Sequence, residues 1–250
     1  MFKRLVLIFL FTPFLAFPQK EIPYQVGEYS AFDVSFGAII VGHAELEIVE
    51  EKLIDSTSTF HIVGKGKTAY FFDWFFKVRD VYETFLDTSK LLPIKFIRDI
   101  NEGPYSKKQN YFFHHSDSIV KHNDTAYKIP FNSQDMLSAL FYARTFNKEE
   151  VKKTSSFFVP IFMDEENYFL EVSYLNNEVI ETEFGKVDCM VFKPKMQEGR
   201  VFEDGEEMKI WISDDKNHLL MKVETKIWAG TIKAVLADYK ELKFPLSIIQ

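Results

Sequence analysis

The sequence predicts a mainly β protein, formed as a curved antiparallel sheet or incomplete β-barrel with one central helix, at about residues 134–145, on its concave side. Three observations lead to this prediction. Apolar and polar side chains alternate along most of the chain, the spacing that places every second residue on one face of a sheet. Short turn sequences separate these runs, as between antiparallel neighbours. A helical spacing of apolar residues is clear in one stretch.

The N-terminal segment has the layout of a cleavable secretory signal peptide. Residues 1–4 supply a short positive region, and the stretch from Leu5 to Phe17 is apolar except for Thr12 and Pro13. This stretch is shorter than the roughly 20 residues of a membrane-spanning helix, and no later segment is long and uncharged enough to span a membrane. We therefore expect a signal peptide at residues 1–19 and one β-rich domain at residues 20–250. The expected location is outside the cytoplasm, with the periplasm favoured over the extracellular space.

The only cysteine, Cys189, lies far from the predicted cleavage region. A lipoprotein needs a lipid-accepting cysteine at the cleavage site, and a disulfide needs two cysteines. We therefore expect a mature chain without lipid anchor or disulfide, in which Cys189 is a small buried side chain of a strand.

Composition indicates an ordered, acidic domain. Hydrophobic residues make up 46% of the chain and aromatic residues 16%, including 27 Phe, whereas 10 Gly and 9 Pro are too few for a low-complexity linker. The formal charge of -7 becomes about -9 when Lys3 and Arg4 leave with the signal peptide. Such a charge disfavours nucleic acid and anionic membranes as partners.

Runs with period 2 define the expected strands. In residues 28–36 the side chains of Phe32, Val34 and Phe36 share one face, and residues 44–48 repeat the pattern after two glycines, as in a hairpin. Further strands are expected at 58–66, 78–87, 93–102, 106–115, 118–122, 157–164, 167–175, 178–183, 187–194, 207–213, 219–228 and 231–242.

Residues that favour tight turns separate many of these strands. They are Glu102-Gly103-Pro104, Asn176-Asn177, Phe184-Gly185, Glu203-Asp204-Gly205 and Ala229-Gly230. We expect antiparallel neighbours on either side of each turn.

Two stretches break the alternation. In the first, Ser133-Gln134-Asp135 can cap a helix that runs through Arg144. The apolar stripe of this helix contains Met136, Leu137, Leu140 and Phe141. The second stretch, residues 69–76, is expected to be a short helix or a buried loop.

The stretch from Tyr70 to Phe76 holds six aromatic residues out of seven. A loop of this length cannot easily bury all six rings while Asp73 and Lys77 stay solvated, so we expect some rings to line a groove or to contact an apolar partner. The alternative is a plug that fills the open end of the sheet.

The chain contains none of the common catalytic motifs: no Gly-rich phosphate loop, Gly-x-Ser-x-Gly, His-Glu-x-x-His or Cys-x-x-Cys. Of His114, His115 and His122, at most one of the adjacent pair can share a site with His122, because neighbouring strand residues point to opposite faces. The acidic residues between Asp204 and Asp215 fit exposed turns better than a calcium loop. We assign no catalytic residue, metal or cofactor.

Arg98 and Glu102 lie four residues apart on one face of an expected strand, and Arg79-Asp80 lies in the preceding one. These charges can form a buried polar network at one end of the barrel. Cross-strand pairing at the surface is the simpler alternative.

Several segments in order carry a family resemblance. They are Pro93-x-x-Phe96-x-Arg98, Glu102-Gly103-x-Tyr105, Asp135-x-Leu137-Ser138-Ala139-Leu140-Phe141-Tyr142-x-Arg144, Trp211-Ile212-Ser213-Asp214-Asp215 and the strand from Gly230. From about Tyr24 to Leu242 the chain resembles the exported bacterial proteins grouped as domain of unknown function 3108. The resemblance implies an exported, mostly antiparallel β domain without an established reaction. In layout alone, residues 219–240 are similar to the last part of periplasmic lipoprotein carriers, whose curved half-barrel shelters acyl chains.

The leading hypothesis is a non-enzymatic periplasmic carrier of an apolar or amphipathic ligand, such as a lipid or an acyl chain. A Phe-lined concavity excludes water, and each acyl CH₂ buried there contributes about 0.8 kcal/mol. The expected ligand-binding residues are Tyr70, Phe71, Trp74 and Phe75 at the entrance and Met136, Leu140 and Phe141 on the inner wall. The alternatives are an envelope assembly or scaffolding protein that binds a protein partner through its aromatic patch, and a metal-assisted hydrolase that uses His114 or His122.

Overall fold

The computed structural model describes residues 21–195 and 207–249. The predicted signal peptide and the predicted turn at Glu203-Asp204-Gly205 lie outside the described residues. Within them, no helix is long and apolar enough to cross a membrane.

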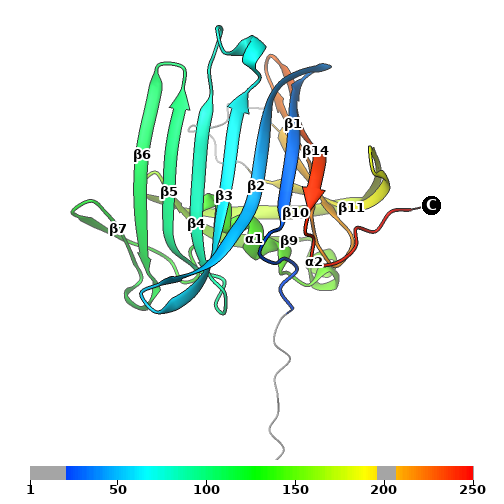
Figure 1. Ribbon diagram of the computed structural model, residues 1–250. Helices are drawn as coiled ribbons and strands as arrows, with labels where there is room; N and C mark the ends of the chain where they lie inside the picture. The colour runs from blue at the N-terminus through cyan, green and yellow to red at the C-terminus, as the bar shows by residue number, and fades with distance from the viewer. Residues whose placement is uncertain (1–20, 196–206, 250) are drawn as a thin grey trace, which may run out of the picture.

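In the described part of the chain, fourteen strands form a single sheet in which neighbouring strands pair antiparallel (Figure 1). The strands are β1 (Tyr29–Phe36), β2 (Ile39–Ile54), β3 (Thr57–Thr68), β4 (Arg79–Asp87), β5 (Pro93–Glu102), β6 (Tyr105–His114), β7 (Ile119–His122), β8 (Thr125–Lys128), β9 (Ser156–Met163), β10 (Glu166–Thr182), β11 (Gly185–Pro194), β12 (Glu207–Ser213), β13 (Leu220–Ile227) and β14 (Gly230–Lys240). Their order in the sheet is β8-β7-β6-β5-β4-β3-β2-β1-β14-β13-β12-β11-β10-β9. The chain is therefore a meander in which β1 pairs with β14 and the connection from β8 to β9 joins the two edges.

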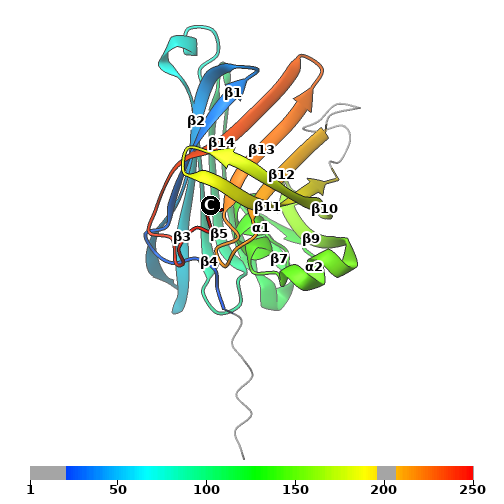
Figure 2. The ribbon, with the colours of Figure 1, turned by 90° about the vertical axis from the view of Figure 1, so that its right-hand side faces the viewer.

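The sheet curves strongly around a helix. Strands β3 to β6 stand upright in Figure 1, while β9 to β11 run across behind them. Helix α1 (Met136–Arg144) lies between these two walls in the perpendicular view (Figure 2). The curved antiparallel sheet with a helix on its concave side was predicted from the sequence and is confirmed.

The two sheet edges, β8 and β9, come close without pairing with each other. Gln134, in the connection between the two edges, pairs with β9: its backbone N–H donates to Pro160 O and its carbonyl accepts from the backbone N–H of Phe162, both at 2.8 Å. Its side-chain amide donates to Leu91 O, just before β5, at 3.1 Å and so reaches the opposite wall. The amide of Asn167 also donates to Lys128 O at 2.8 Å. The sheet is an incomplete barrel that short polar contacts hold together at its open seam.

Helix α1 begins with a capping box. The Asp135 carboxylate accepts hydrogen bonds from the backbone N–H groups of Leu137 and Ser138 at 2.8 and 2.7 Å, and the Asp135 N–H donates to Ser138 Oγ. Thr84 Oγ1 of β4 donates to the same carboxylate at 2.6 Å. Complete burial raises the pKa of Asp135 to about 6, although these hydrogen bonds act in the opposite direction. One side chain thus starts the helix and ties it to the sheet.

The other end of α1 is fixed by a buried ion pair. Arg144 and Glu28 are each 4% exposed, and their forked side chains make two contacts, Nη1 to Oε1 at 2.5 Å and Nη2 to Oε2 at 3.1 Å. Arg144 also donates to Asn217 O, and its guanidinium lies over the rings of Tyr24 and Phe141. The helix is therefore anchored to the N-terminal segment and to the loop before β13.

Among the described residues, three groups of buried side chains form the core. The largest, which we call the aromatic core, fills the space inside β2 to β7 and contains Tyr24, Ile48, Ile62, Leu86, Phe96, Tyr111, Phe113, Leu137, Phe141 and Phe162. A second group joins β1 and β14 to β11–β13 and includes Phe32, Cys189, Trp211 and Leu236. A third group, around Val151, Val172, Met190, Phe192 and Ile212, lies where α2 (Lys148–Thr154) meets the sheet. Cys189 is a buried free cysteine in a strand, as predicted.

Several predicted elements need correction. Asn176 and Asn177 were predicted to form a turn, but they lie inside the continuous strand β10 and pair with Val191 and Met190 of β11; a register shift falls just before them, at Leu175. The short strand β8 and the helix α2 were not predicted. Both α2 and the Asn147 cap that starts it lie in a polar stretch in which the sequence has no apolar stripe.

Candidate functional site

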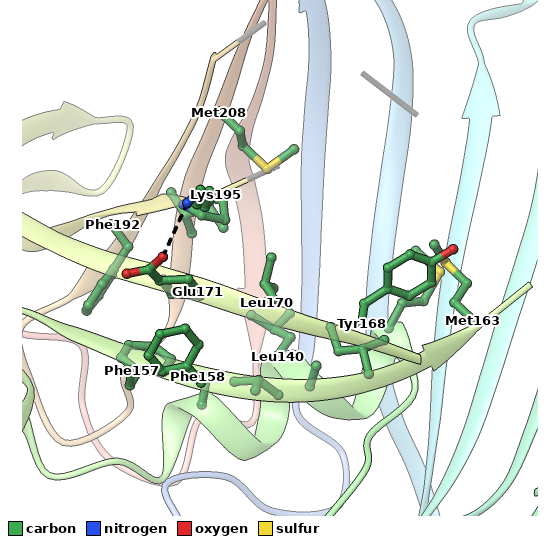
Figure 3. Close-up of a pocket in the computed structure, with 18 of the residues that line it drawn as sticks. Leu140, Phe157, Phe158, Met163, Tyr168, Leu170, Glu171, Phe192, Lys195 and Met208 are labelled. Carbon is green, nitrogen blue, oxygen red and sulfur yellow. Dashed lines mark ion pairs between the residues drawn. The ribbon is translucent and has the colours of Figure 1, made fainter. Parts of the chain in front are cut away.

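A large cavity lies between helix α1 and the β9–β12 wall. Its volume is about 1520 Å³, and its walls come from α1, α2 and strands β9 to β12, with side chains of β4 to β6 at one end (Figure 3). Typical small-molecule sites have volumes of about 300–1,000 Å³. The cavity can therefore hold a ligand larger than an ordinary metabolite.

Alternate residues of the β9–β10 hairpin build the apolar wall. The antiparallel register places Phe157 opposite Val172, Val159 opposite Leu170 and Ile161 opposite Tyr168. All six of these residues line the cavity. Phe158, Phe169 and Glu171, which alternate with these residues, also border the cavity, so residues of both faces of the hairpin contribute. Four residues of the next two strands, Met190, Phe192, Ile210 and Ile212, extend the apolar surface.

Four methionines, Met136, Met163, Met190 and Met208, line the cavity, out of seven in the chain. They come from α1, β9, β11 and β12, so they surround the space from several sides. The methionine side chain is unbranched and polarisable, and it adapts to irregular apolar partners. This wall suits a flexible apolar ligand better than a rigid one of fixed shape.

Helix α1 separates the cavity from the aromatic core. Met136, Ala139, Leu140 and Ala143 line the cavity, and their spacing places them on one helix face. Leu137 belongs to the aromatic core, on the other helix face. Because the side chains of the two alanines are small, they fill little of the space in front of this helix face, and the cavity stays open there.

Charged side chains form one end of the cavity. Arg98 Nη1 and Lys107 Nζ contact Asp164 Oδ1 at 3.0 and 2.7 Å, and all three residues line the cavity. Burial by itself raises the pKa of Asp164, but the hydrogen bond from Lys107 and the charge of Arg98 outweigh it and lower this pKa. The Nε atom of Arg98 is buried and has no hydrogen-bond partner among the residues that the structure describes. Arg98 thus takes part in a partly buried network across the seam rather than in a surface pair.

Glu102, which also borders the cavity, differs from Asp164 in its electrostatic environment. Burial and the neighbouring Asp80 raise its pKa, with a hydrogen bond between the two acids contributing. A second charged pair, Glu171 and Lys195, borders the cavity at the β10–β11 side with 3.8 Å between Oε2 and Nζ (Figure 3). The cavity therefore combines an apolar wall with charged groups of both signs at its margins.

The predicted ligand-binding residues separate into three groups. Met136 and Leu140 line the cavity. Phe141 is 2% exposed and packs in the aromatic core, where its ring lies 5.1 Å from that of Tyr24. The remaining four residues, Tyr70, Phe71, Trp74 and Phe75, do not line the cavity; they lie at the tip of the β3–β4 loop and are 73–92% exposed.

That exposure shows that the alternative interpretation of the loop as a plug was wrong. The loop begins with a turn of 3-10 helix at Tyr70–Phe72 and lies beyond the end of the sheet, so its rings do not enter the barrel (Figure 2).

The structure does not bring the three candidate histidines into one site. The ring of His115 contacts Pro93 O at 2.9 Å, and the ring of His122 contacts Asn110 O at 2.9 Å. The described residues contain no cluster of three or more His, Cys, Asp or Glu that could hold a metal ion. Asp214 serves a structural purpose, because it accepts hydrogen bonds from Lys148 and Lys152 of α2 and from Asn177 of β10.

Sequence reasoning missed the residues of the β9–β12 wall. Their alternation was recognised and used to predict strands, but alternation does not tell which apolar face is covered and which borders a cavity. No signal in the sequence marks this wall, because the four methionines that line it are scattered over α1, β9, β11 and β12.

Comparison with known proteins supports the architecture. A solved structure described as a beta-barrel-like protein of domain of unknown function DUF1849, from Brucella abortus, is similar in fold, with a TM-score of 0.54 and 9% sequence identity. The similarity covers 88% of this chain and 99% of that one. No curated protein matches the sequence. The profile of the family described as "Protein of unknown function (DUF3108)" matches residues 31–237, so the chain belongs to the DUF3108 family.

Proposed function

We propose that this protein is an exported binding or carrier protein whose cavity holds the apolar part of an amphipathic ligand, such as the acyl chain of a lipid. The observation that carries this proposal is the cavity of about 1520 Å³ with an apolar wall rich in methionine and a charged end. A carrier needs such a space, whereas a scaffolding protein has no need to keep its interior open.

The distribution of polar groups supports an amphipathic ligand. An acyl chain against the β9–β12 wall would gain about 0.8 kcal/mol for each CH₂ removed from water. A polar headgroup could then remain at the end that Arg98, Lys107 and Asp164 line. Because charges of both signs lie there, headgroup charge alone would not decide binding.

Export of the protein is part of the proposal, and its support is the basic and apolar N-terminal segment of the sequence. Cell fractionation followed by mass measurement of the purified protein tests it. We expect a product that lacks about the first 19 residues, found in the periplasmic fraction. A full-length product in the cytoplasm would contradict the proposal.

Ligand binding is tested by native mass spectrometry of protein purified from an envelope extract, together with titration of a fluorescent fatty acid. A cavity-filling variant, Ala143→Phe, should weaken probe binding by about tenfold or more, because the new ring occupies space that the ligand needs. Ala126→Phe, at an exposed position of β8 outside the cavity, is the matched control and should bind normally. If no lipid co-purifies and the probe does not bind the unaltered protein, the binding proposal fails.

A further inference from the structure

Four hairpin connections lie at the same end of the sheet. In an antiparallel meander every second turn falls at the same end, so the strand order places the β1–β2, β3–β4, β5–β6 and β13–β14 turns together (Figures 1 and 2). Among the described residues, 22 large hydrophobic side chains are exposed, and ten of them belong to these four turns. Single exposed hydrophobic side chains scattered over a surface are common, but these ten are gathered at one end of the sheet, as at an interaction site.

The β3–β4 loop projects furthest. Its rings are highly exposed: Tyr70 92%, Phe71 73%, Trp74 80% and Phe75 78%. The base of the loop is nevertheless firmly held, because Asp73 pairs with Arg79 at 2.6 Å and accepts a hydrogen bond from Thr68 at 2.6 Å. These contacts hold the loop in a conformation that exposes the aromatic rings to solvent. Packing inside the protein therefore does not explain why the loop is rich in aromatic residues.

The neighbouring turns extend this apolar end. Ile39, Tyr105 and Trp228 are 60%, 51% and 86% exposed at the tips of the other three turns. The turns also pack side by side, since a Cβ added at Gly103 would lie 2.8 Å from the ring of Phe76. A Cβ at Gly230 would likewise lie 2.9 Å from the ring of Phe36. The exposed side chains thus form a rim of protruding tips on one end of the barrel.

The charge of this rim differs from that of the whole chain. Residues 35–41, 67–79, 101–107 and 225–233, which form the four turns and their flanks, contain six basic and two acidic residues. Lys67, Lys107 and Lys233 pair with three acids outside these ranges, Glu45, Asp164 and Glu224, so the net charge including these partners is +1. The complete chain has a net charge of -7. The overall acidity, which disfavours anionic membranes, therefore does not describe this end of the molecule.

We propose that this end of the barrel docks on an anionic lipid surface. Tryptophan and tyrosine favour the boundary between headgroups and hydrocarbon, and nearby basic residues are attracted to anionic lipids. Protruding tips also suit insertion into a soft lipid interface better than packing on a flat protein surface. Docking goes beyond the proposed carrier function and does not need an occupied cavity. Because Glu102 belongs to the β5–β6 end and also borders the cavity, docking would bring the polar end of the cavity close to the headgroups.

Intrinsic fluorescence provides the test. Trp74 and Trp228 lie in the rim, whereas Trp211, the third tryptophan of the chain, is 4% exposed. The full mature protein is mixed with vesicles of phosphatidylcholine and phosphatidylglycerol that carry brominated acyl chains. We expect the protein to co-sediment with the vesicles and the emission of the two rim tryptophans to be quenched. Binding should weaken with added salt and on vesicles of phosphatidylcholine alone.

The decisive variant carries Tyr70→Ser, Phe71→Ser, Trp74→Ser and Phe75→Ser, and its vesicle affinity should fall at least about tenfold, because four exposed rings no longer insert. A variant with Leu53→Ser and Phe131→Ser removes two equally exposed apolar side chains outside the rim and should bind like the unaltered protein. Unquenched rim tryptophans without co-sedimentation would overturn the proposal, as would equal losses in the two variants. The Ala143→Phe variant separates the two proposals, because it should keep vesicle binding while losing the fatty-acid probe.

Discussion

The two walls of the barrel both consist of strands with alternating apolar residues, but one wall faces a filled core and the other faces a cavity. Inside β2 to β7, rigid rings meet in the aromatic core, such as Phe96 and Tyr111 at 6.2 Å between centroids and Tyr111 and Phe162 at 5.2 Å. Inside β9 to β12, methionine and aliphatic side chains border a cavity of about 1520 Å³. Helix α1 lies between the two regions and contributes to both. The comparison shows that alternation makes an apolar face, while the shape and size of the side chains facing it decide whether that face is filled or hollow.

The largest expected effect concerns the ion pair that holds α1 between the walls. Replacing Arg144 by Met leaves the carboxylate of Glu28 buried without its partner, and we expect a loss of about 3–5 kcal/mol in the free energy of unfolding. Urea denaturation followed by circular dichroism measures it. Adding Glu28→Leu to Arg144→Met should recover much of the loss, because no uncompensated charge remains. A double variant no more stable than the single one would show that the charge is not the cause.

The next pair of variants tests the comparison directly at neighbouring residues of α1. Phe141→Ala removes a ring from the aromatic core and should cost about 3–5 kcal/mol. Leu140→Ala lies on the cavity face, where the side chain is only partly buried, and should cost about 1 kcal/mol while weakening fatty-acid binding. Similar losses from the two substitutions in denaturant titrations would mean that the cavity wall is as tightly packed as the core.

A smaller effect is expected at the start of α1. Asp135→Ala removes the helix cap and leaves Thr84 Oγ1 without its acceptor, so we expect a loss of about 3 kcal/mol, whereas Asp135→Asn keeps most of these contacts. Because the pKa of Asp135 is raised from 3.8 to about 6, the folded state binds a proton more tightly than the unfolded state. Stability should therefore fall as the pH rises from about 4 to 6. Denaturant midpoints of Asp135→Asn that follow the same trend would contradict this assignment.

A smaller effect than that of the Asp135 cap is expected at Asp214, which holds α2 against β10 beside the cavity. Burial disfavours its charge, but hydrogen bonds from Lys152, Asn177 and Lys148 outweigh that effect and lower its pKa from 3.8 to about 2. The folded state therefore binds this proton less tightly, and about 2 kcal/mol of stability at neutral pH should be lost as the pH falls from about 4 to 2. Thermal unfolding across this range should show a shallower decline for Asp214→Asn. An unchanged decline would place the acid sensitivity elsewhere.

Much of the fold could be predicted because its signals are local. The strand β5 has the predicted bounds of residues 93–102, and most other strands differ from the prediction by one or two residues at either end, since alternation and turn residues are read from neighbours in sequence. Helix α1, with a cap in the stretch Ser133-Gln134-Asp135, was predicted for the same reason, and the structure identifies Asp135 as the cap. The turn predicted at Asn176-Asn177 failed because pairing with β11 continues through both residues, and that partner strand is not part of the local signal.

The site depended on contacts between distant parts of the chain. Two neighbouring residues of α1, Leu140 and Phe141, were both predicted to face a ligand, yet one borders the cavity and the other is buried in the core. The apolar stripe of a helix shows which residues will be removed from water, but it does not show which of them will pack against the aromatic core and which will line the cavity. The aromatic residues from Tyr70 to Phe76 were recognised as unusual, but their exposure at one end followed only from the order of the strands.

The sequence by itself determined the class of this protein: a β-rich chain with a recognisable succession of strands, one well-capped apolar helix and the motifs of the DUF3108 family. Only the tertiary structure decided that β1 pairs with β14, that Gln134 spans the seam, and that the β9–β12 wall stays hollow while its counterpart is filled. The physical reason is that strand and turn preferences act over a few residues, whereas cavities and rims arise where surfaces far apart in sequence meet.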